Sequence, residues 1–191
     1  MIILLFGVTN VGKTVTGEKL AKKLNFPFID MDEEIKRRFK TTLEIFMKDH
    51  PFSYERGQIK GNLLKDLLKE NKDNVVIAVT IIYYSEFFDS FLDMENVIAI
   101  ELRDSKEHIY DRLVFSDEDD IVYKDDLYKE AHKDYYMNDI HEDIMYAKNL
   151  FKKIKNKYFV NNQSVGEVAD GLIVMINNIL ANTTTDSISQ N

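Results

Sequence analysis

The sequence contains no cysteine. Disulfide bonds, zinc–thiolate centres and thiol nucleophiles are therefore excluded, because each of them needs a cysteine sulfur. A chain without thiols is compatible with a reducing compartment, and we expect this protein to be cytoplasmic. Only two prolines and seven glycines are present, and they form no stretch that resembles a linker between domains. We therefore predict one domain over residues 1–181.

Long hydrophobic runs and an excess of positive charge are also missing. The apolar start, residues 1–6, is too short to span a membrane and lacks the features of a secretory signal. Lysine and arginine number 25 against 33 aspartates and glutamates, which gives a net charge of -8. A chain with this balance has no broad electrostatic attraction for nucleic acid or anionic lipid. We expect neither nucleic acid nor a membrane as a partner.

Apolar residues, at 45% of the chain with 12% aromatic, are sufficient for a sizeable core. Their runs predict strands at residues 2–6, 28–29, 75–80, 97–102 and 158–160, with helical patterns between them. Strands that alternate with helices at this spacing predict an α/β fold with a mainly parallel sheet. The last helix is expected from residue 165 to about residue 180, followed by a disordered polar tail over residues 182–191.

The most informative motif lies between the first expected strand and the first expected helix. Residues 7–14 read Gly-Val-Thr-Asn-Val-Gly-Lys-Thr, which matches the phosphate-binding (Walker A) loop at every specified position. Glycines let the backbone form a nest of N–H donors around phosphate, and the following helix adds the positive end of its dipole. We expect ATP with Mg²⁺ here, with Lys13 on the β- and γ-phosphates and the Thr14 hydroxyl on the metal.

The expected nucleotide-binding residues of this segment are Gly7, Thr9, Asn10, Val11, Gly12, Lys13, Thr14 and Val15. The structural alternative for the motif is a glycine-containing turn that binds nothing.

Two carboxylates follow the second expected strand. Ligands of open α/β sheets bind at the carboxyl ends of the strands, so Asp30 and Asp32 should share one rim with the phosphate loop. Alternation along an extended segment would point both side chains the same way. We predict that Asp30 holds Mg²⁺ through water, and that Asp32 is catalytic and positions or deprotonates an acceptor hydroxyl. Alternatively, Asp32 would only cap a helix that begins at Glu33.

The first part of the chain resembles the shikimate kinases, within the P-loop group of small-molecule and nucleoside-monophosphate kinases. The resemblance is carried by residues 7–14, by Gly17, Leu20-Ala21 and Leu24, by Phe28-Ile-Asp-Met-Asp32 with Ile35, and by Thr42-Leu-Glu-Ile-Phe46. It is close to about Tyr54 and patchy afterwards. It implies a three-layer α/β/α fold with a five-stranded sheet, a substrate-binding helical section and a lid. It also implies transfer of the ATP γ-phosphate to a hydroxyl of a small molecule. It further implies that Arg112 binds the nucleotide on its adenine side. Alternatively, Arg112 lies on a solvated helix surface; no acidic residue lies three or four places away, but a solvated arginine needs no such partner.

Several positions depart from the pattern that the resemblance implies. Glu55 stands where a substrate-binding arginine is implied, with Arg56 one place later, and Ala147 stands where a second arginine is implied, with Lys148 adjacent. Residues 79–81, Val-Thr-Ile, replace three glycines. We expect Arg56 and Lys148, together with Asp32, to bind the substrate. The sequence does not identify the acceptor.

Two other functions remain open at this point. The motif Gly-Val-x-Asn-Val-Gly-Lys-Thr also resembles thymidylate-kinase-like loops, which indicates a nucleoside or nucleotide kinase. The expected lid segment, residues 116–120, is Ser-Asp-Glu-Asp-Asp and lacks the arginine that the resemblance implies. An acidic lid, with the replaced glycines, favours a nucleotide-binding protein without catalysis. Whether the protein is a monomer or a homodimer is also open.

Overall fold

The computed structural model describes the backbone of residues 1–188 and the side chains of residues 1–182. Its elements, in chain order, are β1 (Ile2–Phe6), α1 (Lys13–Leu24), β2 (Phe28–Asp30), α2 (Met31–Phe39), α3 (Leu43–Asp49), α4 (Ser53–Glu70), β3 (Val75–Ala78), the 3-10 turns η1 (Ser85–Phe87) and η2 (Asp89–Phe91), β4 (Val97–Arg103), α5 (Lys106–Asp111), β5 (Phe115–Ser116), β6 (Val122–Tyr123), α6 (Asp126–Ala131), α7 (Lys133–Leu150), β7 (Asn156–Phe159) and α8 (Val165–Ile188).

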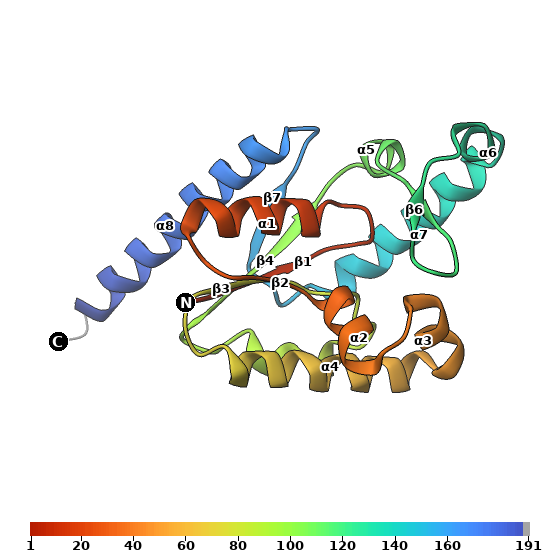
Figure 1. The fold of residues 1–191 in the computed structure, drawn as a ribbon. Helices are drawn as coiled ribbons and strands as arrows, with labels where there is room; N and C mark the ends of the chain where they lie inside the picture. The colour runs from red at the N-terminus through yellow and green to blue at the C-terminus, as the bar shows by residue number, and fades with distance from the viewer. Residues whose placement is uncertain (189–191) are drawn as a thin grey trace.

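Five strands form one sheet in the order β2-β3-β1-β4-β7, and every neighbouring pair is parallel. The helices α1 and α8 cover one face of this sheet and α4 covers the other, which gives three layers (Figure 1). All five residues of β1 are buried, because this strand is central and covered on both sides. The expected α/β fold with a five-stranded parallel sheet is confirmed.

The strand register brings several loops to one edge of the sheet. Leu5 of β1 and Asp30 of β2 both pair with Ala78 at the end of β3, and Phe6 pairs with Glu101 of β4. The carboxyl ends of β1, β2 and β3 are therefore level. The segments that follow them open side by side at this edge, where α2 and α3 also lie (Figure 1).

Two features differ from the expectations. A short antiparallel hairpin of β5 and β6, which the sequence pattern does not predict, lies between α5 and α6. The helix α8 continues to Ile188, so residues 182–188 of the expected disordered tail are helical, and residues 189–191 lie outside the described part of the chain. No proline or glycine follows Gly171 within α8 to stop the helix. Among the described residues, no helix has the length and apolar content of a membrane span.

The contact of α8 with α1 provides a test of the packing. Leu172 of α8 is fully buried, whereas Val174 on the same helix is 59% exposed. We expect Leu172→Ala to lower the free energy of unfolding by about 2–5 kcal/mol, because it leaves a cavity in the core. Val174→Ala, as the matched surface change, should alter it by less than about 0.5 kcal/mol. Urea denaturation of both variants measures the difference, and equal effects would contradict this packing of α8.

Candidate active site

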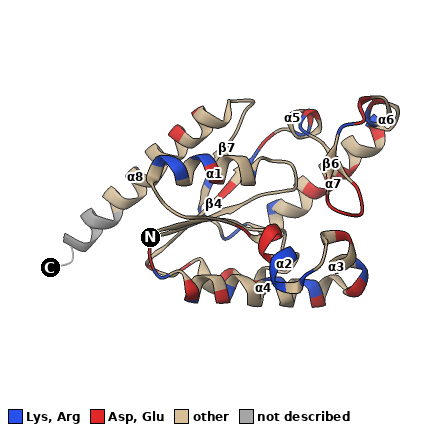
Figure 2. Cartoon of the chain, viewed as in Figure 1, with Lys and Arg blue, Asp and Glu red and all other residues tan. Residues whose placement is uncertain are grey.

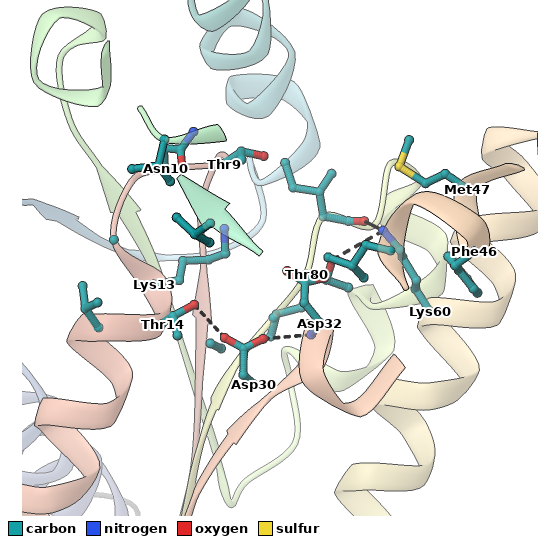
Figure 3. A pocket seen from close by; sticks show the side chains of 18 of the residues that line it. Thr9, Asn10, Lys13, Thr14, Asp30, Asp32, Phe46, Met47, Lys60 and Thr80 are labelled. Carbon is teal, nitrogen blue, oxygen red and sulfur yellow. Dashed lines mark hydrogen bonds between the residues drawn. The ribbon is translucent and has the colours of Figure 1, made fainter. Parts of the chain in front are cut away.

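A cleft of about 690 Å³ opens at the carboxyl edge of the sheet (Figure 3). Its walls come from the phosphate loop, the start of α2, one side of α3 and α4, the segment after β3, and the region from α5 to the hairpin. The lining residues are Thr9, Asn10, Gly12, Lys13, Thr14, Val15, Asp30, Asp32, Leu43, Phe46, Met47, Arg56, Lys60, Ala78, Val79, Thr80, Ile81, Tyr83, Arg112, Val114 and Val122. Residues expected to bind the nucleotide and residues expected to bind the substrate thus meet in one cavity.

The phosphate loop owes its shape to its glycines. Gly7 has a φ of 147°, and a Cβ atom there would lie 2.7 Å from the carbonyl oxygen of Leu102. Gly12 has a φ of 102° and is the N-cap of α1, with no side chain bonded to the first amides of the helix. Val11 is buried and anchors the loop in the core. The amides at the start of α1 are therefore left to an anion in the cleft.

Lys13 lies inside this loop. Its Nζ donates hydrogen bonds to the carbonyl oxygens of Gly7 and Val8, each at 3.0 Å. Desolvation lowers the pKa of Lys13 to about 8, against the negative charges of Asp32 and Asp30, which raise it. No carboxylate among the described residues forms an ion pair with this amine. The cation is therefore held by neutral partners, in position for an anionic ligand.

Asp30 connects the phosphate loop with α2. One of its oxygens, Oδ2, accepts a hydrogen bond from the Thr14 hydroxyl at 2.6 Å, and the other, Oδ1, accepts from the backbone N–H of Asp32 at 2.8 Å. Asp30, and not Asp32, is thus the N-cap of α2, which begins at Met31. The expectation that the two carboxylates follow each other along an extended segment was wrong, although both line the cleft.

Asp32 lies in the first turn of α2 and its side chain is half-buried in the cleft. No described residue donates a hydrogen bond to its carboxylate. Its negative charge raises the pKa of Lys13 and also that of Lys60, in each case against desolvation. The carboxylate is therefore free to accept a proton or a hydrogen bond from a ligand between these two lysines.

Arg112, the C-cap of α5, lines the cleft rather than a solvated helix surface. Its Nη2 donates to Asp104 Oδ2 at 2.7 Å, and its Nε donates to the carbonyl oxygen of Asn10 in the phosphate loop at 3.2 Å. The acidic partner lies eight residues before Arg112, beyond the three- and four-residue spacing of neighbours on one face of a helix. Arg112 consequently joins α5 to the phosphate loop.

The structure separates the two basic residues that we expected to bind substrate. Arg56 lines the cleft, and its Nη1 donates to the carbonyl oxygen of His50 at 2.6 Å. Lys148 does not line it: α7 turns Ala147 inward and leaves Lys148 exposed, beside a separate cavity of about 130 Å³. The predicted role of Lys148 is therefore not supported by its position.

Lys60, which the sequence did not indicate as a site residue, lines the cleft together with Arg56. Its Nζ donates to Thr80 Oγ1 at 3.4 Å and to the carbonyl oxygen of Ile81 at 3.2 Å (Figure 3). The available signal was its spacing, four residues after Arg56 and hence on the same face of a helix.

The hairpin of β5 and β6 lies where the sequence predicts a lid. Its turn is acidic (Figure 2), and Asp120 accepts a hydrogen bond from the backbone N–H of Leu43, the first residue of α3, at 2.8 Å. Val122 of the hairpin faces the cleft. The hairpin therefore presents an apolar side chain to the cavity, and its acidic turn is bonded to the start of α3.

A central parallel strand followed by a phosphate loop, with carboxylates after the edge strand β2, defines a P-loop nucleotide-binding protein of the kinase class. Comparison with known proteins specifies the family. The model of the shikimate kinase family matches residues 9–176. The chain belongs to the shikimate kinase family.

Individual relatives agree with this assignment over different lengths. The shikimate kinase of Cereibacter sphaeroides is 42% identical over 66 residues, a stretch that covers 33% of this chain and 33% of that relative. The sequence match thus spans only about a third of the curated relative. The crystal structure of shikimate kinase from Aquifex aeolicus has a TM-score of 0.71 at 21% identity and covers 94% of this chain and 98% of its own.

A second solved structure, shikimate kinase from Acinetobacter baumannii in complex with shikimate, has a TM-score of 0.71 at 19% identity and covers 93% of each chain. At these identities the solved structures establish a common fold.

The lowered pKa of Lys13 predicts that nucleotide binding takes up protons. Near pH 8 about half of the free protein carries a neutral Lys13, and bound phosphates should restore its charge. Nucleotide affinity should therefore fall as the pH rises from 7 to 9. The stability of the ligand-free protein should depend on pH in the opposite direction. The unfolded chain keeps the Lys13 proton to a higher pH than the folded protein does, so the free energy of unfolding should rise as the pH increases above 8.

Calorimetry of ADP binding at pH 8, in buffers of different ionisation enthalpy, measures the proton uptake. Lys13→Arg is the control, because arginine stays charged at this pH. The same uptake in both proteins would contradict the assignment to Lys13.

Proposed function

We propose that this protein is an ATP- and Mg²⁺-dependent kinase that transfers the γ-phosphate to a hydroxyl of a small molecule, with an acceptor similar to that of the shikimate kinases. The observation that carries the proposal is the position of Asp32. Its carboxylate accepts no side-chain hydrogen bond from a described residue and shares one cleft with Lys13 of the phosphate loop. An acceptor hydroxyl bound to Asp32 would lie beside the end of the bound triphosphate.

The phosphate loop accounts for the nucleotide half of the reaction. The open amides at the start of α1 would bind phosphate oxygens, and Lys13 would exchange the carbonyls of Gly7 and Val8 for the β- and γ-phosphates. In a loose transition state the negative charge gathers on the transferred group and the leaving oxygen. The charge of Lys13 would stabilise both.

Thr14 and Asp30 suit the metal that accompanies ATP. Their side-chain oxygens lie 2.6 Å apart on the rim of the cleft. Mg²⁺ takes one or two protein oxygens and completes its octahedron with phosphate oxygens and water, so this donor pair fits it. When bound, the ion would neutralise charge on the phosphates. Asp30 would keep its other oxygen on the N–H of Asp32, which fixes the start of α2 relative to the loop.

Asp32 would position the acceptor. Phosphoryl transfer is catalysed mainly by positioning and charge stabilisation. A carboxylate that holds the hydroxyl in line with the γ-phosphate would therefore contribute much of the rate enhancement. The same carboxylate would accept the hydroxyl proton as the new bond forms.

The family model over residues 9–176 supports an acceptor of the shikimate type over the nucleoside or nucleotide kinase alternative. The acidic hairpin, which offers no cation to the phosphates, is the observation that favours a non-catalytic nucleotide-binding protein. These alternatives differ in acceptor-dependent turnover. The oligomeric state and the cytoplasmic location stay predictions.

ATP consumption by the wild type and by Lys13→Ala is the test of the proposed function. The panel contains shikimate, other hydroxy acids, sugars, nucleosides and nucleoside monophosphates. We expect turnover that depends on a hydroxy acid and is lost in Lys13→Ala, since the variant lacks the charge opposite the transferred phosphate. Turnover on a nucleoside or its monophosphate would favour the second kinase. ATP binding with no acceptor-dependent turnover would support the non-catalytic alternative.

Asp32→Asn should lower kcat by about 10²- to 10⁴-fold, because the amide cannot accept the hydroxyl proton. The KM for ATP should change little. The comparison is made over a range of pH, because the charge of Asp32 raises the pKa of Lys13 and its loss should lower that pKa further.

The control for this variant is Glu33→Gln on the same turn of α2. The Glu33 side chain is 69% exposed and pairs with Lys36 at the surface, so its loss should leave kcat unchanged. Equal kcat values for Asp32→Asn and the wild type would refute the catalytic role of Asp32.

A further inference from the structure

A buried carboxylate directly after β4 holds the arginine that lines the cleft beside the phosphate loop. The carboxylate belongs to Asp104, whose side chain is only 2% exposed. Its Oδ2 accepts a hydrogen bond from Arg112 Nη2 at 2.7 Å. Its Oδ1 lies 2.8 Å from His108 Nδ1 and accepts from the backbone N–H of Ser105 at 2.9 Å. An acidic side chain is seldom buried to this degree unless other groups pair with it.

The surrounding elements do not need this carboxylate for their own ends. Helix α5 already has an N-cap, because the hydroxyl of Ser105 accepts a hydrogen bond from the first turn of the helix. The other arginine nearby, Arg103, is bonded to a different acid: its Nε and Nη2 each donate to Glu101 at 2.9 Å. Asp104 is therefore left to pair with side chains of α5, and Arg112 is the one of these that lines the cleft.

The carboxylate of Asp104 stays ionised in its buried position. Burial raises the pKa of Asp104, but the hydrogen bonds from His108, Arg112 and the N–H of Ser105 outweigh this effect and hold the pKa below its usual value. The negative charge of Asp104 therefore offsets the positive charge of Arg112 at close range. In this respect Arg112 differs from Lys13, whose amine donates to two neutral carbonyl groups.

The pairing also fixes the direction of the guanidinium group. Arg112 Nη2 is bound to Asp104, and Nε donates to the carbonyl oxygen of Asn10 in the phosphate loop at 3.2 Å. These two nitrogen atoms form one edge of the planar group, so the other nitrogen, Nη1, and the flat faces are left over. No described residue accepts a hydrogen bond from Nη1. The side chain of Arg112 remains 31% exposed and is accessible from the cleft.

A paired guanidinium group binds ligands differently from a free cation. Because its charge is offset, it adds little attraction for phosphate, whereas its flat face suits an aromatic ring. In a bound nucleotide the base supplies such a ring. The phosphates are then left to Lys13 and to the open amides at the start of α1.

We propose that Asp104 is a positioning residue of the nucleotide site, which holds Arg112 against the phosphate loop and offsets its charge. The arginine then adds to the affinity for the nucleoside part of the ligand without acting as a phosphate-binding cation. The inference rests on the proposed function for the binding of ATP. Its basis is an almost completely buried carboxylate that is not the cap of α5 and is bonded to the arginine of the cleft.

Calorimetric titrations of ADP and of inorganic pyrophosphate test the proposal, since pyrophosphate lacks the base. We expect Asp104→Ala to weaken ADP binding by about tenfold, because Arg112 is no longer held in place. Pyrophosphate binding should stay the same or become tighter, because an unpaired Arg112 adds positive charge to the cleft. The ratio of the two dissociation constants is therefore the quantity to compare. Asp104→Asn retains the size of the side chain and one acceptor for Arg112, so it should fold and lose less affinity for ADP.

Asp111→Ala is the matched control, because Asp111 lies on α5 next to Arg112, is exposed and carries the same charge. This variant should bind both ligands like the wild type. Thermal unfolding of each variant, with and without ADP, confirms that the proteins compared are folded.

The double variant separates positioning from a purely structural role. In the Arg112→Ala background, Asp104→Ala should weaken ADP binding no further, since Asp104 acts through Arg112. If the two changes add, or if Asp104→Ala weakens the binding of ADP and pyrophosphate equally, Asp104 only supports the fold and the proposal is wrong.

Turnover distinguishes the failure of this inference from the failure of the proposed function. If ADP affinity depends on Asp104 as expected while no acceptor supports ATP consumption, the kinase function fails and the positioning role stands. If acceptor-dependent turnover occurs while Asp104→Ala binds ADP as tightly as Asp111→Ala does, the kinase function stands and the positioning role fails. A wild type that binds pyrophosphate as tightly as ADP would also overturn the proposal.

Discussion

Both carboxylate oxygens of Asp30 are engaged, one by the hydroxyl of Thr14 and one by the backbone N–H of Asp32 in the first turn of α2. Through this residue the loop that follows the central strand is fixed to the helix that follows the edge strand. The level ends of β1, β2 and β3 make the contact possible, since they bring the two segments to the same height. The two parts of the cleft that we propose for the nucleotide and for the acceptor therefore have a fixed relation to each other, which in-line transfer would require.

The cationic side chains in the phosphate loop and on α4 share one property. Lys13, Arg56 and Lys60 make hydrogen bonds to neutral oxygen atoms only, whereas Arg112 at the edge of the site is paired with Asp104. Free cations are costly to a folded protein, and they are tolerated where a ligand supplies the missing charge. The site thus combines a rigid frame, held by Asp30 and Arg112, with cations that remain available.

Much of the fold was predictable, because the main strands and the phosphate loop can be recognised from short stretches of sequence. The three buried strands β1, β3 and β4 appear as apolar runs, and the phosphate loop is recognised from the spacing of Gly7, Gly12 and Lys13 alone. The start of α2 was harder. Asp30 and Asp32 are equally suitable N-caps by residue type, and in the structure Asp30 caps the helix while its other oxygen accepts a bond from Thr14 of another element.

The remaining differences arise from tertiary contacts. Sequence spacing allowed us to inspect only the neighbours of Arg112 within its helix, and its partner Asp104 lies on the loop before that helix. Lys148 was expected to bind the substrate because it is adjacent to Ala147, the position of an implied arginine, but the packing of α7 turns Lys148 outward. Lys60 was overlooked because one lysine on a charged helix is unremarkable until the helix is placed against a cleft.

The hairpin beside the cleft has a consequence for how movements within the site are linked. Its acidic turn is attached to the first amide of α3 through Asp120, and it offers no positive charge that a triphosphate could attract. A displacement of α3 would therefore be transmitted to the hairpin through this hydrogen bond.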